Sequence, residues 1–183
     1  MSQKSICVYC GSRLGTQTAY AGEAAALGQI IAAEGWRLVY GAGDVGLMGT
    51  IARATQQAGG ATFGVIPVHL LRAEVGKTDL TTFVVTETMH ERKKVMLMNA
   101  DAVVVMPGGP GSLDEFFEVL TWRQLGLHDK PIVLLDAQGY WGPLRALLQH
   151  TVDHGFAEDS LLDFVQCGAT AEEVAGLLRR ALS

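Results

Sequence analysis

The stretch AVVVMPGGPGSLDE (residues 102–115) decides the fold class, because it leads from an apolar run through a glycine-rich turn into a helical pattern. The five residues AVVVM (102–106) are all apolar, and a run without alternation is typical of a strand buried on both faces of a parallel sheet. A helix is expected to follow the turn over residues 112–125. A strand, a turn and a helix in this order form the repeating unit of parallel α/β proteins.

The same order recurs along the chain. Strands are expected at residues 5–10, 36–40, 61–66, 82–86, 102–106, 131–135 and 162–165, and helices at 17–34, 47–58, 89–99, 112–125, 140–154 and 171–182. The sequence therefore predicts an α/β fold, a single Rossmann-like three-layer sandwich with a parallel central sheet and right-handed crossovers. The 183 residues correspond to one domain, 1–183.

Composition excludes several classes of protein. With 49% hydrophobic and 18% charged residues the chain is not intrinsically disordered, and a net charge of −5 argues against nucleic acid or an anionic membrane as partner. No apolar run approaches the roughly 18 residues of a spanning helix, and the first residues carry no leader pattern, so we expect a cytoplasmic protein. Cys7 and Cys10 form C-x-x-C within a strand-like run, which favours buried packing over redox chemistry.

Three glycine-bearing turns follow expected strands, at residues 10–13 (CGSR), 41–46 (GAGDVG) and 107–112 (PGGPGS). Ligands of open parallel sheets bind at the carboxyl ends of the strands, where these turns must lie. Glycine lets backbone amides approach a ligand closely, and a helix N-terminus adds unpaired N–H groups with partial positive charge. The turns are therefore predicted to cradle phosphate.

The turn at 41–46 matches G-x-G-x-x-G, but we do not favour a nicotinamide dinucleotide. That fingerprint also needs an acid at the end of the next strand to bind the ribose, and this strand ends VIPVH (65–69) without one. No G-K-[ST] follows any of the turns, so a Walker A site is not predicted either.

Charged residues near the third turn indicate more specific chemistry. Ser112 is a candidate N-cap or phosphate donor, and Glu115 is expected to point back towards the turn, although S-x-x-E is also an ordinary capping box. Arg92 and Lys93 fall in the first turn of another helix, where cations oppose the helix dipole unless an anion or an acid is near. Together these residues suggest a phosphomonoester site with one carboxylate facing the sugar. The five histidines lack metal-site spacing, so no metal is expected.

Four segments resemble the Lonely Guy (LOG) family of cytokinin riboside 5′-monophosphate phosphoribohydrolases, whose older members were often labelled lysine decarboxylases. They are GAGDVGLMG (41–49), MHERKKVM (89–96), PGGPGSLDE (107–115) and TWRQLGLHDKPIVLL (121–135). The resemblance covers nearly the whole chain. Nothing in the sequence resembles a Schiff-base lysine pocket for pyridoxal phosphate.

The resemblance implies hydrolysis of the N-glycosidic bond of a purine nucleoside 5′-monophosphate, giving the free base and ribose 5-phosphate without a cofactor. It assigns Arg92 and Glu115 as the catalytic pair. The substrate contacts that it implies are Gly108, Gly109, Gly111 and Ser112 on the phosphate, Lys93 assisting, Glu74 and Thr121 at further positions, and Ser12 and Gly43 at the rim. The family also implies a homodimer with the site near the subunit boundary.

The residues can support this chemistry, because cleavage of a ribosyl N-glycoside passes through an oxocarbenium-like centre that a carboxylate stabilises. Beside Arg92, Glu115 is expected to stay ionised, and Asp114 to point off the opposite side of the turn. Two alternatives stay open: an AMP nucleosidase without cytokinin specificity, and a nucleotide-binding protein without turnover.

Overall fold

The computed structural model describes residues 3–71 and 77–183, and within them the chain forms one seven-stranded parallel sheet. The strand order is β4-β3-β2-β1-β5-β6-β7. The strands are β1 (Ser5–Tyr9), β2 (Arg37–Tyr40), β3 (Ala61–Pro67), β4 (Thr82–Thr86), β5 (Ala102–Val105), β6 (Ile132–Leu135) and β7 (Val165–Gly168). The prediction of a parallel α/β sheet is confirmed.

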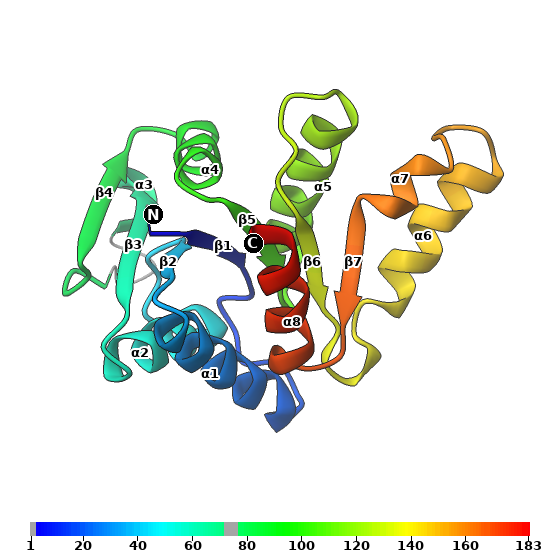
Figure 1. Ribbon diagram of the computed structural model, residues 1–183. Coiled ribbons are helices and arrows are strands. Elements are labelled where there is room, and N and C mark those ends of the chain that lie inside the picture. The colour runs from blue at the N-terminus through cyan, green and yellow to red at the C-terminus, as the bar shows by residue number, and fades with distance from the viewer. Residues whose placement is uncertain (1–2, 72–76) are drawn as a thin grey trace.

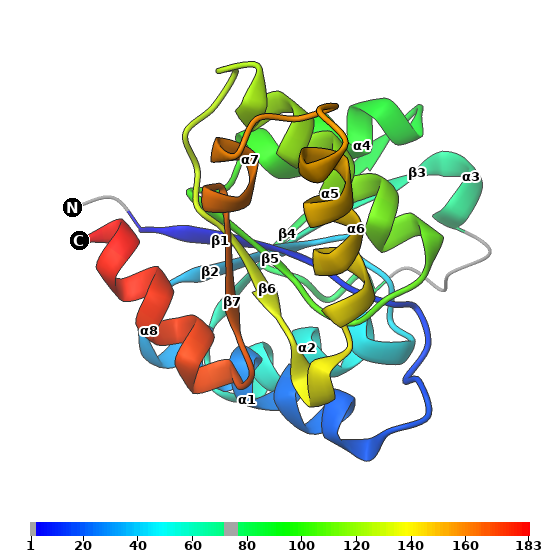
Figure 2. The same cartoon turned by 90° about the vertical axis from the view of Figure 1, so that its right-hand side faces the viewer.

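Helices cover both faces of the sheet (Figure 1, Figure 2). One layer contains α1 (Thr18–Ala33), α2 (Gly46–Gln57) and α8 (Ala171–Leu182); the other contains α4 (Met89–Met98), α5 (Pro110–Gln124), α6 (Gly142–Asp153) and α7 (Ser160–Asp163). The one-turn helix α3 (Val68–Leu71) follows β3, and the 3-10 turn η1 (Ala137–Gly139) follows β6. The expected three-layer sandwich is thus present.

The central strands are buried on both faces, as their unbroken apolar runs predict. Along β1, Ile6 and Val8 pack with the α1–α2–α8 layer, while Cys7 and Tyr9 pack with the other layer. All four side chains are at most 1% exposed. The expectation that Cys7 is a packing residue is therefore confirmed.

The strand order reverses direction in the middle of the sheet, and this reversal positions a ligand site. Strand β1 lies between β2 and β5, so the chain winds towards one edge through β2, β3 and β4 and towards the other through β5, β6 and β7. The loops after β1 and β5 therefore diverge and leave a crevice at the carboxyl ends of these strands.

The structure shifts several predicted boundaries by a few residues, among them the start of the helix predicted at 140–154, which begins at Gly142, and two of the differences have clear physical reasons. Helix α5 begins at Pro110 rather than at residue 112, because proline is well suited to the first helical position. The last strand is Val165–Gly168 and not 162–165. The apolar pair in SLLD (160–163) belongs to the short helix α7, where Leu161 is buried, whereas this edge strand exposes Gln166 and Cys167.

The packing of α1 on α2 depends on Gly28, which is buried where the two helices cross. A Cβ at this position would lie 2.6 Å from the Ile51 carbonyl oxygen and 3.0 Å from the Thr55 hydroxyl. We expect Gly28→Ala to lower the free energy of unfolding by about 1–3 kcal/mol, because the helices must move apart. Urea unfolding measures this change.

The control for this prediction is Gly22→Ala on the exposed side of the same helix, where an added Cβ meets nothing within 4 Å. It should raise stability by up to about 1 kcal/mol through helix propensity. Equal stabilisation by both substitutions would contradict the close packing of the two helices.

Candidate active site

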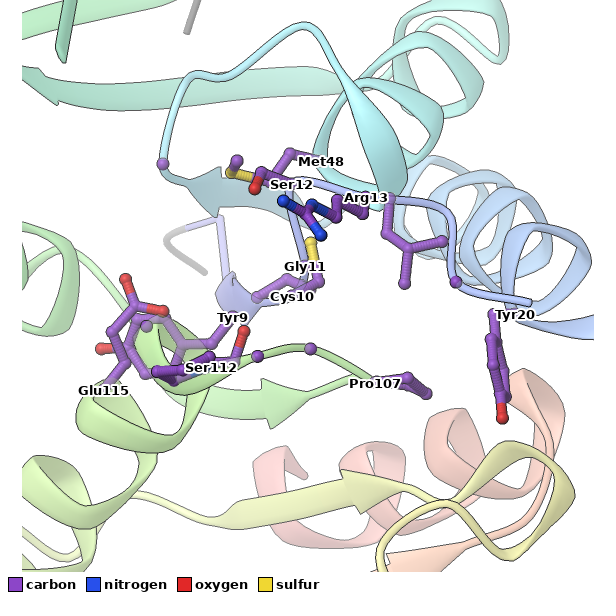
Figure 3. A pocket seen from close by; sticks show the side chains of 18 of the residues that line it. Tyr9, Cys10, Gly11, Ser12, Arg13, Tyr20, Met48, Pro107, Ser112 and Glu115 are labelled. Atoms are coloured by element: carbon purple, nitrogen blue, oxygen red, sulfur yellow. The ribbon is translucent and has the colours of Figure 1, made fainter. Parts of the chain in front are cut away.

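A cavity of about 580 Å³ opens at the carboxyl ends of β1, β2 and β5, in the crevice that the strand order creates (Figure 3). This volume lies within the range of small-molecule sites. Its walls come from loops and helices far apart in sequence. The lining includes residues 10–15 and Tyr20; Gly41, Leu47 and Met48; Leu70; Met89, Arg92 and Met96; and 107–112, Glu115 and Tyr140.

The glycine loop after β5 leads into α5 with no side-chain cap. Gly109 is the N-cap and Pro110 the first helical residue, so Ser112 is inside the first turn. Of the two roles that the sequence allows for Ser112, the N-cap role is wrong and the role of phosphate donor stays a prediction; the capping-box interpretation of Glu115 is wrong as well. Ser112 is 3% exposed, and its hydroxyl occupies the space that a Cβ at Gly108 would need. Gly108 must therefore be glycine for Ser112 to take its place in the cavity wall.

The buried cation of the cavity is Arg92, which is 5% exposed on α4. Its Nε donates to the Val65 carbonyl at 3.0 Å and its Nη2 to the Gly41 carbonyl at 2.6 Å. These bonds fix the guanidinium at the ends of β2 and β3. A Cβ at Gly41 would collide with Nη2, so the absence of a side chain there makes room for the cation.

Glu115 lies on α5, and its carboxylate is on the cavity wall near Ser112 and Tyr9 (Figure 3). Arg92 and Glu115 thus line the same cavity from different helices, as the sequence predicts. The cavity brings together a cation, a carboxylate and a helix N-terminus, which is the arrangement needed to hold an anionic ligand beside a reacting carbon.

The N-terminus of α4 is stabilised by its own cap. The Thr88 hydroxyl accepts from the Glu91 N–H at 3.2 Å, and the Thr88 N–H donates to the Glu91 carboxylate at 3.3 Å. This capping box explains how the helix starts although Arg92, Lys93 and Lys94 lie in its first two turns.

Lys93 does not line the cavity. Its Nζ donates to Asp114 at 3.0 Å and to Glu118 at 2.8 Å, tying α4 to α5. Burial lowers the pKa of Lys93, but the two carboxylates outweigh burial and the pKa lies above its ordinary value. Contact between Lys93 and a phosphate stays a prediction and would require these pairs to open.

Some of the other predicted substrate contacts line the cavity and some do not. Ser12, Gly109 and Gly111 line the cavity; Gly43 is buried outside it, and Thr121 is exposed on α5 outside it. Glu74 lies outside the residues that the structure describes. Asp114 points away from the cavity to Lys93, as expected.

Sequence reasoning missed several lining residues, among them Arg13, Tyr20, Met48, Met89 and Tyr140. Arg13 stands in the CGSR turn and could have been found there, because it is a cation in a predicted phosphate loop. The two tyrosines come from α1 and from the segment after η1, which no local pattern connects with the glycine loops.

The cavity contains a cysteine that is not a nucleophile. Burial raises the pKa of the Cys10 thiol far above its ordinary value, and the negative charge of Glu115 raises it further. The thiol stays protonated at neutral pH, and a protonated thiol is a poor nucleophile.

Comparison with known proteins identifies the family. The family described as "Possible lysine decarboxylase" matches residues 48–178. A cytokinin riboside 5′-monophosphate phosphoribohydrolase of Rhodococcoides fascians is 45% identical over 84% of this chain and 78% of its own. The chain belongs to the family whose model matches residues 48–178. A probable cytokinin riboside 5′-monophosphate phosphoribohydrolase of rice is 40% identical over 92% of the chain and 76% of its own.

Solved structures share the fold at lower identity. A molybdenum cofactor carrier protein of Chlamydomonas reinhardtii has a TM-score of 0.74 at 23% identity, covering 99% of both chains. A molybdenum cofactor binding protein of Rippkaea orientalis has a TM-score of 0.75 at 23% identity, covering 100% of this chain and 99% of its own. These likenesses confirm the Rossmann-like fold of this chain.

The cavity does not fit the cofactor that the family's older label implies. Pyridoxal phosphate enzymes form a Schiff base with a lysine, and no lysine among the described residues lines the cavity. No group of metal-ligating residues is found in the described part of the chain. No helix among these residues is long and apolar enough to cross a membrane.

The cysteines yield a test of the cavity's chemistry. The pKa values of all three thiols are raised, that of Cys167 by partial burial and by Asp136, but Cys7 and Cys10 are buried whereas Cys167 is exposed to reagents on an edge strand. We expect iodoacetamide at pH 7.5 to modify Cys167 alone in the native protein and all three thiols after denaturation. Peptide mass spectrometry locates the label; rapid native alkylation of Cys10 would contradict a protonated, buried thiol.

Proposed function

We propose that this protein hydrolyses the N-glycosidic bond of purine nucleoside 5′-monophosphates of the cytokinin type, with an N6-substituted adenine as base. The products are the free base and ribose 5-phosphate. The observation that carries the proposal is the shared cavity of Arg92, Glu115 and the glycine loop after β5. The names of the 45% and 40% identical relatives support the same substrate class.

The phosphate binds at the start of α5. Helix N-termini present unpaired N–H groups and partial positive charge to an anion. Here the loop contributes Gly108, Gly109, Gly111 and the Ser112 hydroxyl, and Pro110 contributes no N–H donor. Ser12 completes the rim from the loop after β1.

The sugar lies beside Glu115, between the phosphate and Arg92. As the bond from C1′ to the base nitrogen breaks, positive charge develops at C1′ and the ionised carboxylate stabilises it. Glu115 also orients the attacking water and accepts its proton as the water oxygen bonds to C1′. The base leaves with the electron pair of the broken bond and takes a proton from solvent at nitrogen, and Glu115 returns its proton to solvent. Arg92 lines the same cavity and contributes a positive charge to it.

Replacing the carboxylate tests this assignment. Glu115→Gln keeps the size and polarity of the side chain but removes the charge and the basic oxygen. We expect the release of base to fall about 100- to 10,000-fold while nucleotide affinity changes little, because the phosphate contacts remain. Chromatography of free base and isothermal titration calorimetry measure the two quantities.

Glu118→Gln is the matched control, since Glu118 lies one turn further along α5, pairs with Lys93 and does not line the cavity. It should turn over at nearly the normal rate. Near-normal release of base by Glu115→Gln would refute the catalytic role.

The choice of substrate separates the alternatives. Faster cleavage of N6-isopentenyl-AMP than of AMP supports the cytokinin assignment, and the reverse supports an AMP nucleosidase. Binding of both nucleotides without release of base by the unaltered protein would indicate a nucleotide carrier. The carrier is disfavoured because binding a phosphate gains little from a carboxylate in the same cavity.

The protein is further proposed to act as a homodimer through the ends of α4 and α5. Met98, Leu125 and Leu127 are 67–69% exposed, and they lie at the same end of two adjacent helices on one face of the sheet. Such a group of apolar side chains is unusual on a surface in water.

The cytoplasm is the proposed location of the protein, and the three cysteines, which form no disulfide, support this proposal.

Charge on this surface should prevent association. The double substitution Leu125→Asp and Leu127→Asp is expected to reduce the mass in sedimentation equilibrium from about two chains to one, because two carboxylates would be buried without partners. Val45→Asp places the same charge on an exposed residue at the start of α2, in the opposite helix layer, and should leave the mass unchanged. A monomeric unaltered protein at micromolar concentration would contradict the dimer.

A further inference from the structure

A tyrosine hydroxyl on the cavity wall is bonded to the backbone of the glycine loop. Tyr140 follows η1, and its hydroxyl donates to the Gly108 carbonyl oxygen at 2.6 Å. Tyr140 and Gly108 both line the cavity, although they are separated by 32 residues. The bond joins the segment after β6 to the loop after β5.

Two glycines, Gly108 and Gly109, flank the peptide that receives this bond. Ser112 packs against Gly108, but a Cβ at Gly109 would meet nothing within 4 Å, so packing on the Gly109 side does not fix the rotation of the peptide. In a trans peptide the carbonyl and the following N–H point in opposite directions. By fixing the Gly108 carbonyl, the Tyr140 hydroxyl also fixes the direction of the Gly109 N–H.

The direction of this N–H matters because the helix start is short of donors. Pro110 supplies none, which leaves the amides of Gly109, Gly111 and Ser112 and the Ser112 hydroxyl. Among the described residues the Gly109 N–H donates to no other backbone oxygen. One misdirected peptide would remove one of three backbone donors from the anion site.

Tyr140 is itself well anchored. The next residue, Trp141, donates its backbone N–H to the Asp136 carboxylate at 2.6 Å and its indole N–H to the Val105 carbonyl at 3.2 Å. The Tyr140 ring packs edge-on against Tyr20, with ring centres 5.6 Å apart. The hydroxyl is therefore held in place before a ligand binds, so no binding energy is needed to order it.

We propose that Tyr140 is a positioning residue that presets the Gly108–Gly109 peptide so that the Gly109 N–H binds the phosphate monoester of the substrate. This inference rests on the proposed function for the location of the phosphate. It assigns to Tyr140 a contribution to recognition of the phosphate, and none to the reaction at C1′.

The substitution Tyr140→Phe keeps the ring and its packing and removes only the hydroxyl. We expect the inhibition constant for ribose 5-phosphate to rise about five- to twentyfold, from the loss of one oriented charge-assisted hydrogen bond. The kcat/KM for the nucleoside 5′-monophosphate should fall by a similar factor, mainly through KM. The kcat/KM for the unphosphorylated nucleoside should not change, and this readout separates positioning of the phosphate site from general damage.

Thr151→Val is the matched control. The Thr151 hydroxyl donates to the Leu148 carbonyl at 2.7 Å within α6, so this variant also deletes a hydroxyl-to-carbonyl bond, but away from the cavity. It should bind ribose 5-phosphate normally. An equal loss of affinity in Thr151→Val, or normal affinity in Tyr140→Phe, would overturn the inference.

Calorimetric titration with ribose 5-phosphate keeps this test separate from the proposed function, because it needs no turnover. Weaker binding by Tyr140→Phe supports the positioning role even if the unaltered protein releases no base, a result by which the proposed hydrolysis alone would fail. An unaltered protein that does not bind ribose 5-phosphate would overturn the positioning role directly.

Discussion

The buried guanidinium of Arg92 is the constraint on which the site depends. A cation removed from water costs several kcal/mol unless acceptors surround it, and here the carbonyls of Gly41 and Val65 provide them. These carbonyls come from the ends of two neighbouring strands, so the position of the cation is set by the register of the sheet. Gly41 must lack a side chain to admit it. The fold therefore fixes the position of the Arg92 positive charge, which lines the same cavity as Glu115.

Much of this arrangement could be predicted from the sequence, because it is encoded locally. The apolar run at 102–106 is too uniform for a surface strand, and residues 102–105 of it form β5, a buried strand next to the middle of the sheet. The glycine turns after β1, β2 and β5 had to meet because parallel strands end at one edge. Arg92 and Glu115 were predicted at one site on the ground that cations in a first helical turn need an acid or an anion nearby. That both line one cavity agrees with this argument.

The parts that could not be predicted depend on which side chains meet across the fold. Lys93 and Arg92 are adjacent in sequence, yet on a helix they point about 100° apart, so one faces the cavity and the other faces Asp114 and Glu118. The pattern S-x-x-E gave the wrong helix start because Pro110 begins the helix earlier. Tyr140 carried no signal at all, since its partner is a backbone oxygen 32 residues away.

Among the described residues no lysine lines the cavity, and this affects how an anion is bound. A lysine would bind phosphate as a mobile point charge that needs little geometry, whereas backbone amides bind only if their N–H groups converge. The Ser112 hydroxyl and the helix start give directional donors, and Arg92 is already committed to two carbonyls. Apart from Arg13, which lines the same cavity, the donors at this site are directional, so the affinity for an anion depends on the orientation of a few peptides. Residues outside the glycine loop that hold those peptides then matter as much as the loop itself, and sequence motifs centred on glycine cannot reveal them.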